Sequence, residues 1–140
     1  MLLKSLSQFK KNKEVFGIGV DVVKKERIKK LIKNRFFIER IFSKKEIKNS
    51  SKIKNKCKYF SNRFAAKEAL VKSLGTGFRY NINFKDISVI NNKLGKPQIK
   101  ITDNIKKIIF SRFKVKKISI FLSLSDEKNY SIAFVIAQKN

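Results

Sequence analysis

The sequence predicts one α+β domain, with a largely antiparallel sheet packed against one long helix and several shorter helices. Its 140 residues suffice for one domain. The hydrophobic content of 42% allows a packed core. One strand is followed by a group of helices, a strand pair, a helix and a second strand pair, an order typical of the α+β class. We expect a basic N-terminal arm over residues 1–15 and the domain over residues 16–140.

The first half of the chain predicts one strand and a group of short helices. The apolar run from Phe16 to Val23 indicates a buried strand that contains one aspartate. An apolar stripe among lysines then favours a helix, formed by Val23, Ile28, Leu31 and Ile32. Residues 36–42 indicate a second short helix, and Ser43 with Glu46 is typical of a capping box that opens a further helical turn. A polar loop is expected over residues 49–56.

The second half predicts the long helix and most of the sheet. Residues 57–74 are rich in helix-forming residues and end at Gly75, a natural C-terminal cap. Residues 84–91 alternate as a strand, and the turn at residues 95–97 leads into a strand over 98–102. Thr102 or Asp103 caps a helix over 104–113. The last strands, 116–125 and 130–138, are joined by a hairpin turn at residues 126–129.

The charge of the chain restricts its partners. There are 35 Lys and Arg residues against 10 Asp and Glu, a net charge of +25. Such a surface attracts nucleic acid, phosphorylated metabolites, acidic lipids or an acidic protein. The basic residues are mostly lysines spread along the whole chain, which is equally consistent with a solvated basic surface.

Cysteine and histidine usage excludes several kinds of site. The chain has one cysteine, Cys57, and no histidine, so it forms no intrachain disulfide and no Cys/His metal cluster. This usage favours a reducing compartment, and we expect a cytoplasmic protein. No apolar run approaches the roughly 20 residues of a membrane span.

The acids are informative because they are rare. Helix caps, helix surfaces or turns explain Glu14, Glu26, Glu39, Glu46, Asp103 and Glu127. Three others are harder to explain: Asp21 in the first strand, Glu68 in the middle of the long helix, and Asp126 near the end of the chain. A carboxylate in an apolar run is costly unless a cation lies beside it.

Asp21 and Glu68 each allow a structural and a functional interpretation. Asp21 is placed to cap the following helix, and Glu68 is placed to form an i,i+4 ion pair with Lys72. Alternatively, the two carboxylates together hold one Mg²⁺ ion, which in proteins is commonly bound by one or two carboxylates, waters and substrate phosphates. Arg63 and Lys72 would then suit a pyrophosphate.

Four segments carry a family resemblance, in the order "GIGVDVVKKERI", "NRFAAKEALVKSLGTGF", "DISVINNKLGKPQI" and "SLSDEKNYSIAFVIA". They resemble the holo-[acyl-carrier-protein] synthases, the bacterial type of 4′-phosphopantetheinyl transferase, over residues 16–137. The resemblance implies the fold of that family. It also implies transfer of 4′-phosphopantetheine from coenzyme A to a serine of apo-acyl carrier protein, in support of fatty acid biosynthesis, with adenosine 3′,5′-bisphosphate as the second product.

The resemblance also implies roles for individual residues. Asp21 and Glu68 match the Mg²⁺ ligands, and Glu68 and Lys72 match the catalytic residues. The positions that line the coenzyme site match Arg63, Lys72, Gly75, Gly95, Lys96 and Pro97. Arg27 matches a residue that docks the acidic carrier protein, with Lys24 and Lys30 as neighbours. The family is typically a homotrimer with its active sites between subunits.

One position departs from the family pattern, and two other functions remain open. The penultimate strand of the family usually ends in "S-[IL]-[ST]-H", whereas this chain has Asp126 in place of the histidine. Asp126 is either a turn residue or a partner of a nearby cation. One alternative function is a basic nucleic-acid-binding domain, and the other is an inactive relative that binds coenzyme A or carrier protein without turnover. The chain has no recognisable nucleic-acid-binding motif, so the enzyme is favoured.

Overall fold

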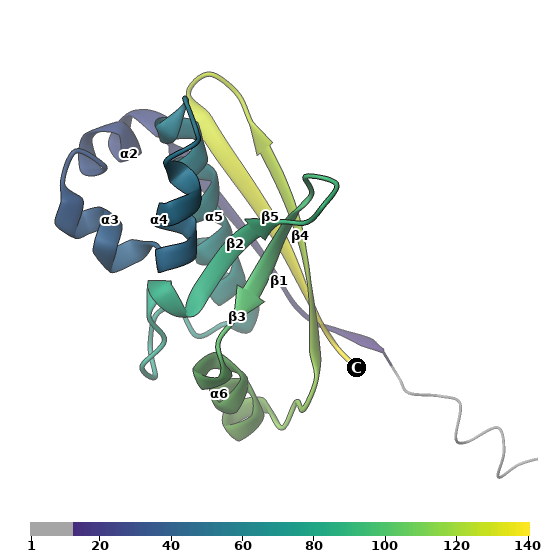
Figure 1. Cartoon of the computed structure of the whole chain (residues 1–140). Coiled ribbons are helices and arrows are strands. Elements are labelled where there is room, and N and C mark those ends of the chain that lie inside the picture. Colours follow the sequence, from purple (N-terminus) through teal and green to yellow (C-terminus); the bar gives the residue numbers. More distant parts are fainter. Residues whose placement is uncertain (1–12) are drawn as a thin grey trace, which may run out of the picture.

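The computed structural model describes residues 13–140, which form one α+β unit (Figure 1). The predicted arm of residues 1–15 lies mostly outside the described residues, and the described sheet begins at Glu14. None of the described helices is long and apolar enough to cross a membrane. In chain order the elements are β1 Glu14–Lys24, α2 Lys25–Leu31, α3 Arg35–Ile41, α4 Lys44–Ser50, α5 Lys56–Leu74, the 3-10 turn η1 Phe84–Asp86, β2 Ile87–Asn91, β3 Pro97–Ile101, α6 Asp103–Phe113, β4 Ile118–Asp126 and β5 Tyr130–Lys139.

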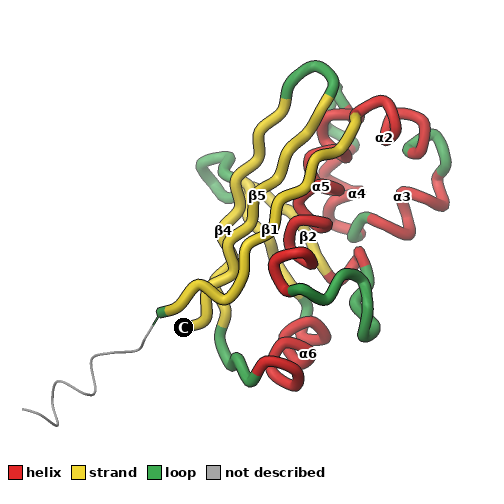
Figure 2. The backbone as a smooth tube through the Cα atoms, turned by 180° about the vertical axis from the view of Figure 1, so that it is seen from behind, coloured by secondary structure: helices red, strands yellow, loops and turns green. Residues whose placement is uncertain are grey.

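The strands pair antiparallel, as the sequence predicts, but they form two sheets rather than one. The larger sheet has the strand order β1-β5-β4, and the smaller sheet is the β2-β3 hairpin. Seen from behind, the helices α2 to α5 lie to one side of the three long strands (Figure 2). The first strand therefore joins the sheet beside the last one, with Asp21 opposite Ala133.

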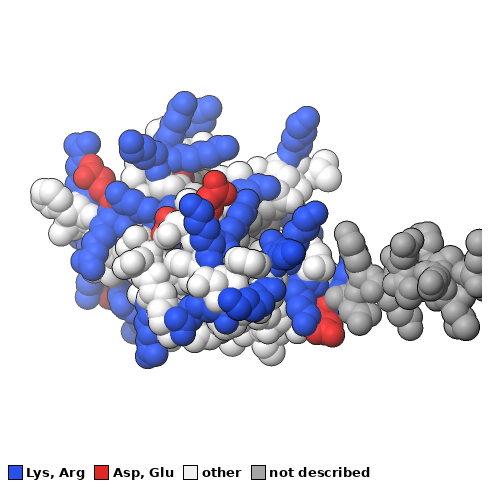
Figure 3. Space-filling view, turned by 90° about the horizontal axis from the view of Figure 1, so that it is seen from below, with Lys and Arg blue, Asp and Glu red and all other residues white. Residues whose placement is uncertain are grey.

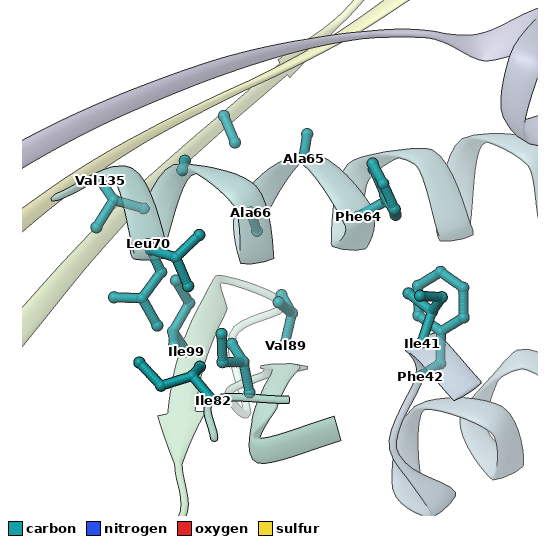
Figure 4. Close-up of a cluster of buried hydrophobic side chains, with 14 of the residues drawn as sticks. Ile41, Phe42, Phe64, Ala65, Ala66, Leu70, Ile82, Val89, Ile99 and Val135 are labelled. Atoms are coloured by element: carbon teal, nitrogen blue, oxygen red, sulfur yellow. The ribbon is translucent and has the colours of Figure 1, made fainter. Parts of the chain in front are cut away.

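The core lies between α5 and the two sheets. Figure 4 shows Phe64, Ala66 and Leu70 of α5 among side chains from β2, β3, β5 and the end of α3. Val89, Ile99 and Val135 represent the three strands, and each is buried. The long helix is thus surrounded by apolar contacts, which fixes its position relative to β1.

Two glycines let β1 lie directly against α5. A Cβ at Gly17 would stand 1.8 Å from the carbonyl oxygen of Ser73, and one at Gly19 would stand 2.0 Å from that of Ala69. Neither distance is possible for a real side chain, so both positions require glycine for the close approach. The "GIG" sequence is therefore the reason that the strand carrying Asp21 and the helix carrying Glu68 lie in contact.

A buried ion pair ties α4 to α5. Lys67 Nζ donates to Glu46 Oε1 at 2.6 Å, and both side chains are fully buried. The ammonium group also donates to the carbonyl oxygens of Ile41, Phe84 and Ile87. Glu46 forms the predicted capping box with Ser43, and its other oxygen accepts from Val89 N at 3.1 Å. The predicted capping box is confirmed, and the carboxylate also neutralises Lys67, a role that the sequence did not predict.

Two local expectations are corrected, and the alternatives for the cap of α6 are decided. Residues 84–86 form a 3-10 turn rather than the start of a strand, because Asp86 N bonds back to Asn83 O. Thr102 is the N-cap residue of α6, and Asp103 is its first helical residue. Asp126 is the last residue of β4, paired with Ser131, so the turn begins after it.

Candidate active site

Asp21 faces α5 rather than solvent. Along β1, the side on which Gly19 and Val23 are buried is also the side of Asp21, whereas Val20 and Val22 are exposed on the opposite side. The Asp21 carboxylate accepts from Lys72 Nζ at 3.0 Å. The Asp21 side chain is 14% exposed and the Lys72 side chain is 53% exposed, so the carboxylate is shielded from water but its cation is not.

Glu68 lies one helical turn before Lys72 and is half-buried. Burial raises the pKa of the Glu68 carboxyl, and the nearby Asp21 carboxylate raises it further. Lys72 and Arg27 act in the opposite direction, because each cation favours the ionised form. Two carboxylates and two cations therefore influence one another where β1, α2 and α5 meet.

Both structural interpretations of these acids are wrong. Asp21 does not cap α2, because the N-cap residue is Lys24 and no side chain caps that end of the helix. Lys72 forms its ion pair with Asp21 on the neighbouring strand, and no ion pair with Glu68 is present among residues 13–140. Its ammonium group also donates to the Val20 carbonyl at 3.0 Å. Lys72 therefore joins α5 to β1.

The donor set formed by Asp21 and Glu68 fits a hard divalent cation that also binds a phosphate. The neighbouring Asp21 carboxylate contributes to the raised pKa of Glu68, and a cation would relieve the repulsion between the two groups. In the described part of the chain, no group of three or more His, Cys, Asp and Glu residues forms a complete metal cage. Two carboxylates do not complete the coordination of a metal ion. Such a partial set of oxygen ligands suits Mg²⁺, which retains bound water molecules and also binds the phosphate oxygens of substrates.

Arg63 lies on a different side of α5, where it is a buried cation. Its guanidinium stacks on the Tyr59 ring at 3.5 Å from the centroid, and Nη1 donates to the Tyr59 carbonyl at 3.4 Å. Burial lowers the pKa of Arg63, and Nε has no hydrogen-bond partner. A hollow of about 300 Å³ beside it is lined by Asn49, Lys52, Ile53, Tyr59, Arg63 and Asn91. A buried donor without a partner suits an anionic ligand group.

Sequence reasoning missed Tyr59 as a neighbour of Arg63. The signal was available, because the two residues are four positions apart in the long helix and therefore share a face. The aromatic ring holds the guanidinium plane in place and leaves its edge free for a planar or tetrahedral anion.

The remaining predicted coenzyme residues lie in two turns. Gly75 ends α5 with φ +68°, as the predicted C-terminal cap. Gly95, with φ +83°, and Lys96 form the turn between β2 and β3, and Pro97 begins β3. No hydrogen bond or ion pair among the described residues joins this turn to Asp21 or Glu68. The structure thus brings together Asp21, Glu68 and Lys72, but not the 95–97 turn with them.

The predicted docking residues lie on and beside α2. Lys24, Arg27 and Lys30 line an open hollow together with Glu26 and Leu31. Arg27 also lies 5.9 Å from the centroid of the Phe64 ring and acts on the pKa of Glu68. This basic surface is therefore adjacent to the acidic site.

Asp126 is held by lysines. Lys25 Nζ contacts Asp126 Oδ2 at 2.8 Å, and Lys58 Nζ lies 3.8 Å from Oδ1. Lys25 also donates to the Glu127 carbonyl, and its backbone N–H donates to Asn129 O at 2.8 Å. Of the two interpretations of Asp126, the geometry favours the partner of a nearby cation. The Lys25–Asp126 ion pair therefore connects the start of α2 with the end of β4, beside the β4–β5 turn.

Comparison with known proteins places the chain in a family. The family profile of the 4′-phosphopantetheinyl transferase superfamily matches residues 17–135. A holo-[acyl-carrier-protein] synthase of Pelagibacter ubique is 58% identical over 126 residues, which are 90% of this chain and 98% of that protein.

Solved structures show the same fold. The crystal structure of holo-[acyl-carrier-protein] synthase from Neisseria meningitidis has a TM-score of 0.80 and 34% identity, and the match covers 90% of this chain and all of that one. The synthase from Bacillus anthracis, solved in complex with CoA (3′,5′-ADP), has a TM-score of 0.76 and 30% identity, covering 90% and 98% of the two chains.

The fold and the paired carboxylates thus belong to a group-transfer enzyme that handles a phosphate-bearing substrate. The chain belongs to the 4′-phosphopantetheinyl transferase superfamily.

Proposed function

We propose that this enzyme transfers the 4′-phosphopantetheine group from coenzyme A to a serine hydroxyl of apo-acyl carrier protein through the site formed by Asp21, Glu68 and Lys72. The observation that carries the proposal is the meeting of the two carboxylates across the β1–α5 contact, with Lys72 bonded to Asp21 at 3.0 Å. Similarity to named synthases over nine-tenths of the chain supports the reaction and both substrates.

The chemistry requires positioning and charge neutralisation more than an unusual side chain. The serine oxygen forms a bond to the phosphorus of the pantetheine phosphate, and the bond to the adenosine bisphosphate breaks. Glu68 accepts the serine proton, directly or through a water. Lys72 is placed to balance negative charge on the departing phosphate.

Asp21 and Glu68 would together hold a Mg²⁺ ion, because within residues 13–140 no third protein ligand joins them and phosphate oxygens would have room to bind. When bound, the metal ion polarises the pyrophosphate and offsets charge that develops on the leaving group. Asp21 orients this site through its contact with Lys72, since the ammonium group is fixed by the Val20 carbonyl as well.

Arg63 and the 95–97 turn would bind other parts of coenzyme A. The buried guanidinium, with its unpartnered Nε, suits a phosphate group of the nucleotide end. No hydrogen bond or ion pair within residues 13–140 joins the 95–97 turn to the carboxylates, which is consistent with an active site completed by a second copy.

An exposed apolar sheet face supports the homotrimer. The outer side of the larger sheet carries exposed residues from all three strands: Ile18, Val20, Val22, Phe121, Ile132 and Phe134. Val20 is opposite Phe134, and Val22 is opposite Ile132, so these side chains form one continuous surface. An apolar face of this kind marks a protein–protein contact.

The basic surface on α2 suits an acidic carrier protein. Lys24, Arg27 and Lys30 lie beside the carboxylate site, so a docked carrier would bring its serine close to Glu68. Figure 3 shows that lysine and arginine side chains also cover much of the face seen from below. Such a surface accelerates association with an acidic partner.

The experiment that tests the proposal is incubation of the protein with apo-acyl carrier protein, coenzyme A and Mg²⁺. We expect the carrier to gain the mass of one phosphopantetheine group, as measured by mass spectrometry. Coenzyme A binding without transfer would instead indicate an inactive relative. Absence of both would contradict the proposed function.

A further inference from the structure

A second hollow, separate from the proposed active site, lies between α3, α4 and the start of α5. Its volume is about 720 Å³, within the range of small-molecule sites. The lining residues are Arg35, Ile38, Glu39, Phe42, Lys44, Ile47, Lys48, Ser50, Lys56, Phe60 and Lys85. None of these residues belongs to the Asp21–Glu68 site or to the hollow beside Arg63.

The inner wall of this hollow is apolar. The buried rings of Phe42 and Phe60 pack together, with centroids 4.6 Å apart. Ile38 of α3 and Ile47 of α4 are partly exposed and pack against this buried core. A ligand chain placed here would remove aliphatic and aromatic surface from water, which favours binding.

The rim of the hollow is strongly cationic. Arg35 is already paired with Glu39 at 2.7 Å. Lys44, Lys48 and Lys85 form no ion pair within residues 13–140. Lys56 donates to the carbonyl oxygens of Ser50 and Ile53, at 2.6 and 3.0 Å, but to no carboxylate.

Four positive charges thus surround an apolar interior without a protein anion to balance them. They come from α4, α5 and the turn η1, so they approach the hollow from several sides. Several positive charges around one opening would attract a ligand with one anionic head group. The apolar wall would contact the hydrocarbon chain of that ligand.

We propose that this hollow binds a single-headed anionic amphiphile, namely a long-chain carboxylate, with its head among Lys44, Lys48 and Lys56 and its chain against Ile38, Ile47 and Phe60. An acidic protein segment would also be attracted to the rim. The compact hollow favours the small amphiphile, because α3 and α4 have only seven residues each and extend about 10 Å.

The test is a titration of the full-length protein with sodium dodecanoate below its micelle concentration, measured by calorimetry. We expect one equivalent to bind. Octanoate, decanoate and dodecanoate should bind progressively more tightly, by about four-fold for each methylene group that becomes buried. Dodecyl maltoside, which has the same chain and a neutral head, should bind at least ten-fold more weakly.

Two matched variants separate this site from the overall charge of the protein. Lys44→Glu and Lys45→Glu make the same charge change in the first turn of α4, where a glutamate is compatible with the helix. Only Lys44 lines the hollow. We expect Lys44→Glu to weaken dodecanoate binding at least five-fold and Lys45→Glu to change it less than two-fold. Equal weakening in both variants would overturn the proposal, because binding would then follow net charge.

Two further measurements identify the occupant. In a protein with ¹³C-labelled isoleucine methyl groups, assigned with Ile38→Val and Ile47→Val, dodecanoate should shift the signals of Ile38 and Ile47 and leave that of Ile120 unchanged. Shifts elsewhere only would contradict the site. If apo-acyl carrier protein loses affinity in Lys44→Glu but not in Lys45→Glu, while dodecanoate leaves the Ile38 and Ile47 signals unchanged, the hollow is a protein-docking surface and the amphiphile proposal fails.

Discussion

Lys67 and Glu68 are consecutive residues of α5, yet their charged groups lie in opposite environments. Lys67 is completely buried and donates to one carboxylate and three carbonyl oxygens. Glu68 is half-buried and accepts no hydrogen bond from the described residues, and its pKa is raised by burial and by Asp21. One charge is satisfied by the fold, and the next is left for a ligand.

The difference shows how a single helix combines structural and chemical roles. The face with Lys67 fixes α5 against α4 and β2 through Glu46. The face with Glu68 and Lys72 is then held against β1 at a defined rotation. An unsatisfied carboxylate is costly, and it is retained where binding requires it.

The largest expected effect is on catalysis. Glu68→Gln keeps the shape of the side chain and removes its charge, so the transfer rate should fall by about a thousand-fold. The rate is measured by mass spectrometry of the carrier protein. Glu39→Gln, the same change in an exposed surface pair, should leave the rate within two-fold. Near-normal turnover in Glu68→Gln would contradict a catalytic role for Glu68, and with it the functional contrast between Glu68 and Lys67.

Removing the satisfied charge should instead affect folding. Lys67→Met leaves the buried Glu46 carboxylate without its cation, and we expect a loss of about 3–5 kcal/mol in the free energy of unfolding. Urea denaturation followed by circular dichroism measures it. The double variant with Glu46→Gln should recover part of the loss. An unchanged stability for Lys67→Met alone would contradict a structural role.

The contact between β1 and α5 is the next most sensitive feature. Gly19→Ala places a methyl group 2.0 Å from the Ala69 carbonyl oxygen. We expect a destabilisation of about 3 kcal/mol, together with loss of transfer activity as the two carboxylates separate. Gly77→Ala is a control, because a Cβ there has no atom within 4 Å and only the positive φ is unfavourable. An equal loss in both variants would exclude the packing explanation.

Glu68→Gln should also stabilise the metal-free protein. A carboxyl with a higher pKa in the folded chain binds its proton more tightly there, so its ionisation lowers the stability of the fold. The loss is absent below about pH 4 and complete above the raised pKa. The thermal midpoint of Glu68→Gln should therefore exceed that of the original protein at pH 7, and the difference should vanish as the pH falls below the ordinary glutamate pKa. The reverse trend would contradict the direction of the pKa shift.

The smallest effect is expected at Asp126. Its pair with Lys25 is partly exposed, so Asp126→Asn should lower the free energy of unfolding by about 1 kcal/mol or less. A change of several kcal/mol would place this residue with Lys67 among the essential structural charges. Asp126→His restores the histidine of the family pattern. A large gain in transfer rate would show that Asp126 lowers the catalytic rate.

The sequence predicted most elements because their signals are local. Helical periodicity, Gly75 and the Ser43–Glu46 capping box defined the helices, and alternation defined the long strands. The 3-10 turn at residues 84–86 was missed because its Asp86–Asn83 bond competes with an alternating pattern that also fits a strand. The burial of Glu46 depends on Lys67, 21 residues later, and no local pattern contains that contact.

The sequence predicted which residues form the candidate site, but not which of them contact one another. Rarity of acids singled out Asp21 and Glu68, and the resemblance assigned them a shared metal. The partner of Lys72 was not predictable from helical spacing, because the i,i+4 rule favours Glu68, whereas the tertiary contact with β1 brings Asp21 to 3.0 Å. The contact between Tyr59 and Arg63, by contrast, could have been predicted, because the two residues are four positions apart in the long helix.

The glycine contact has a consequence for how the enzyme tolerates change. Because main-chain atoms of β1 and α5 touch without intervening side chains, repacking elsewhere in the core displaces both carboxylates as one rigid piece. Substitutions beneath α5 should then lower the melting temperature well before they alter the affinity for magnesium, so heat resistance and metal affinity can vary independently.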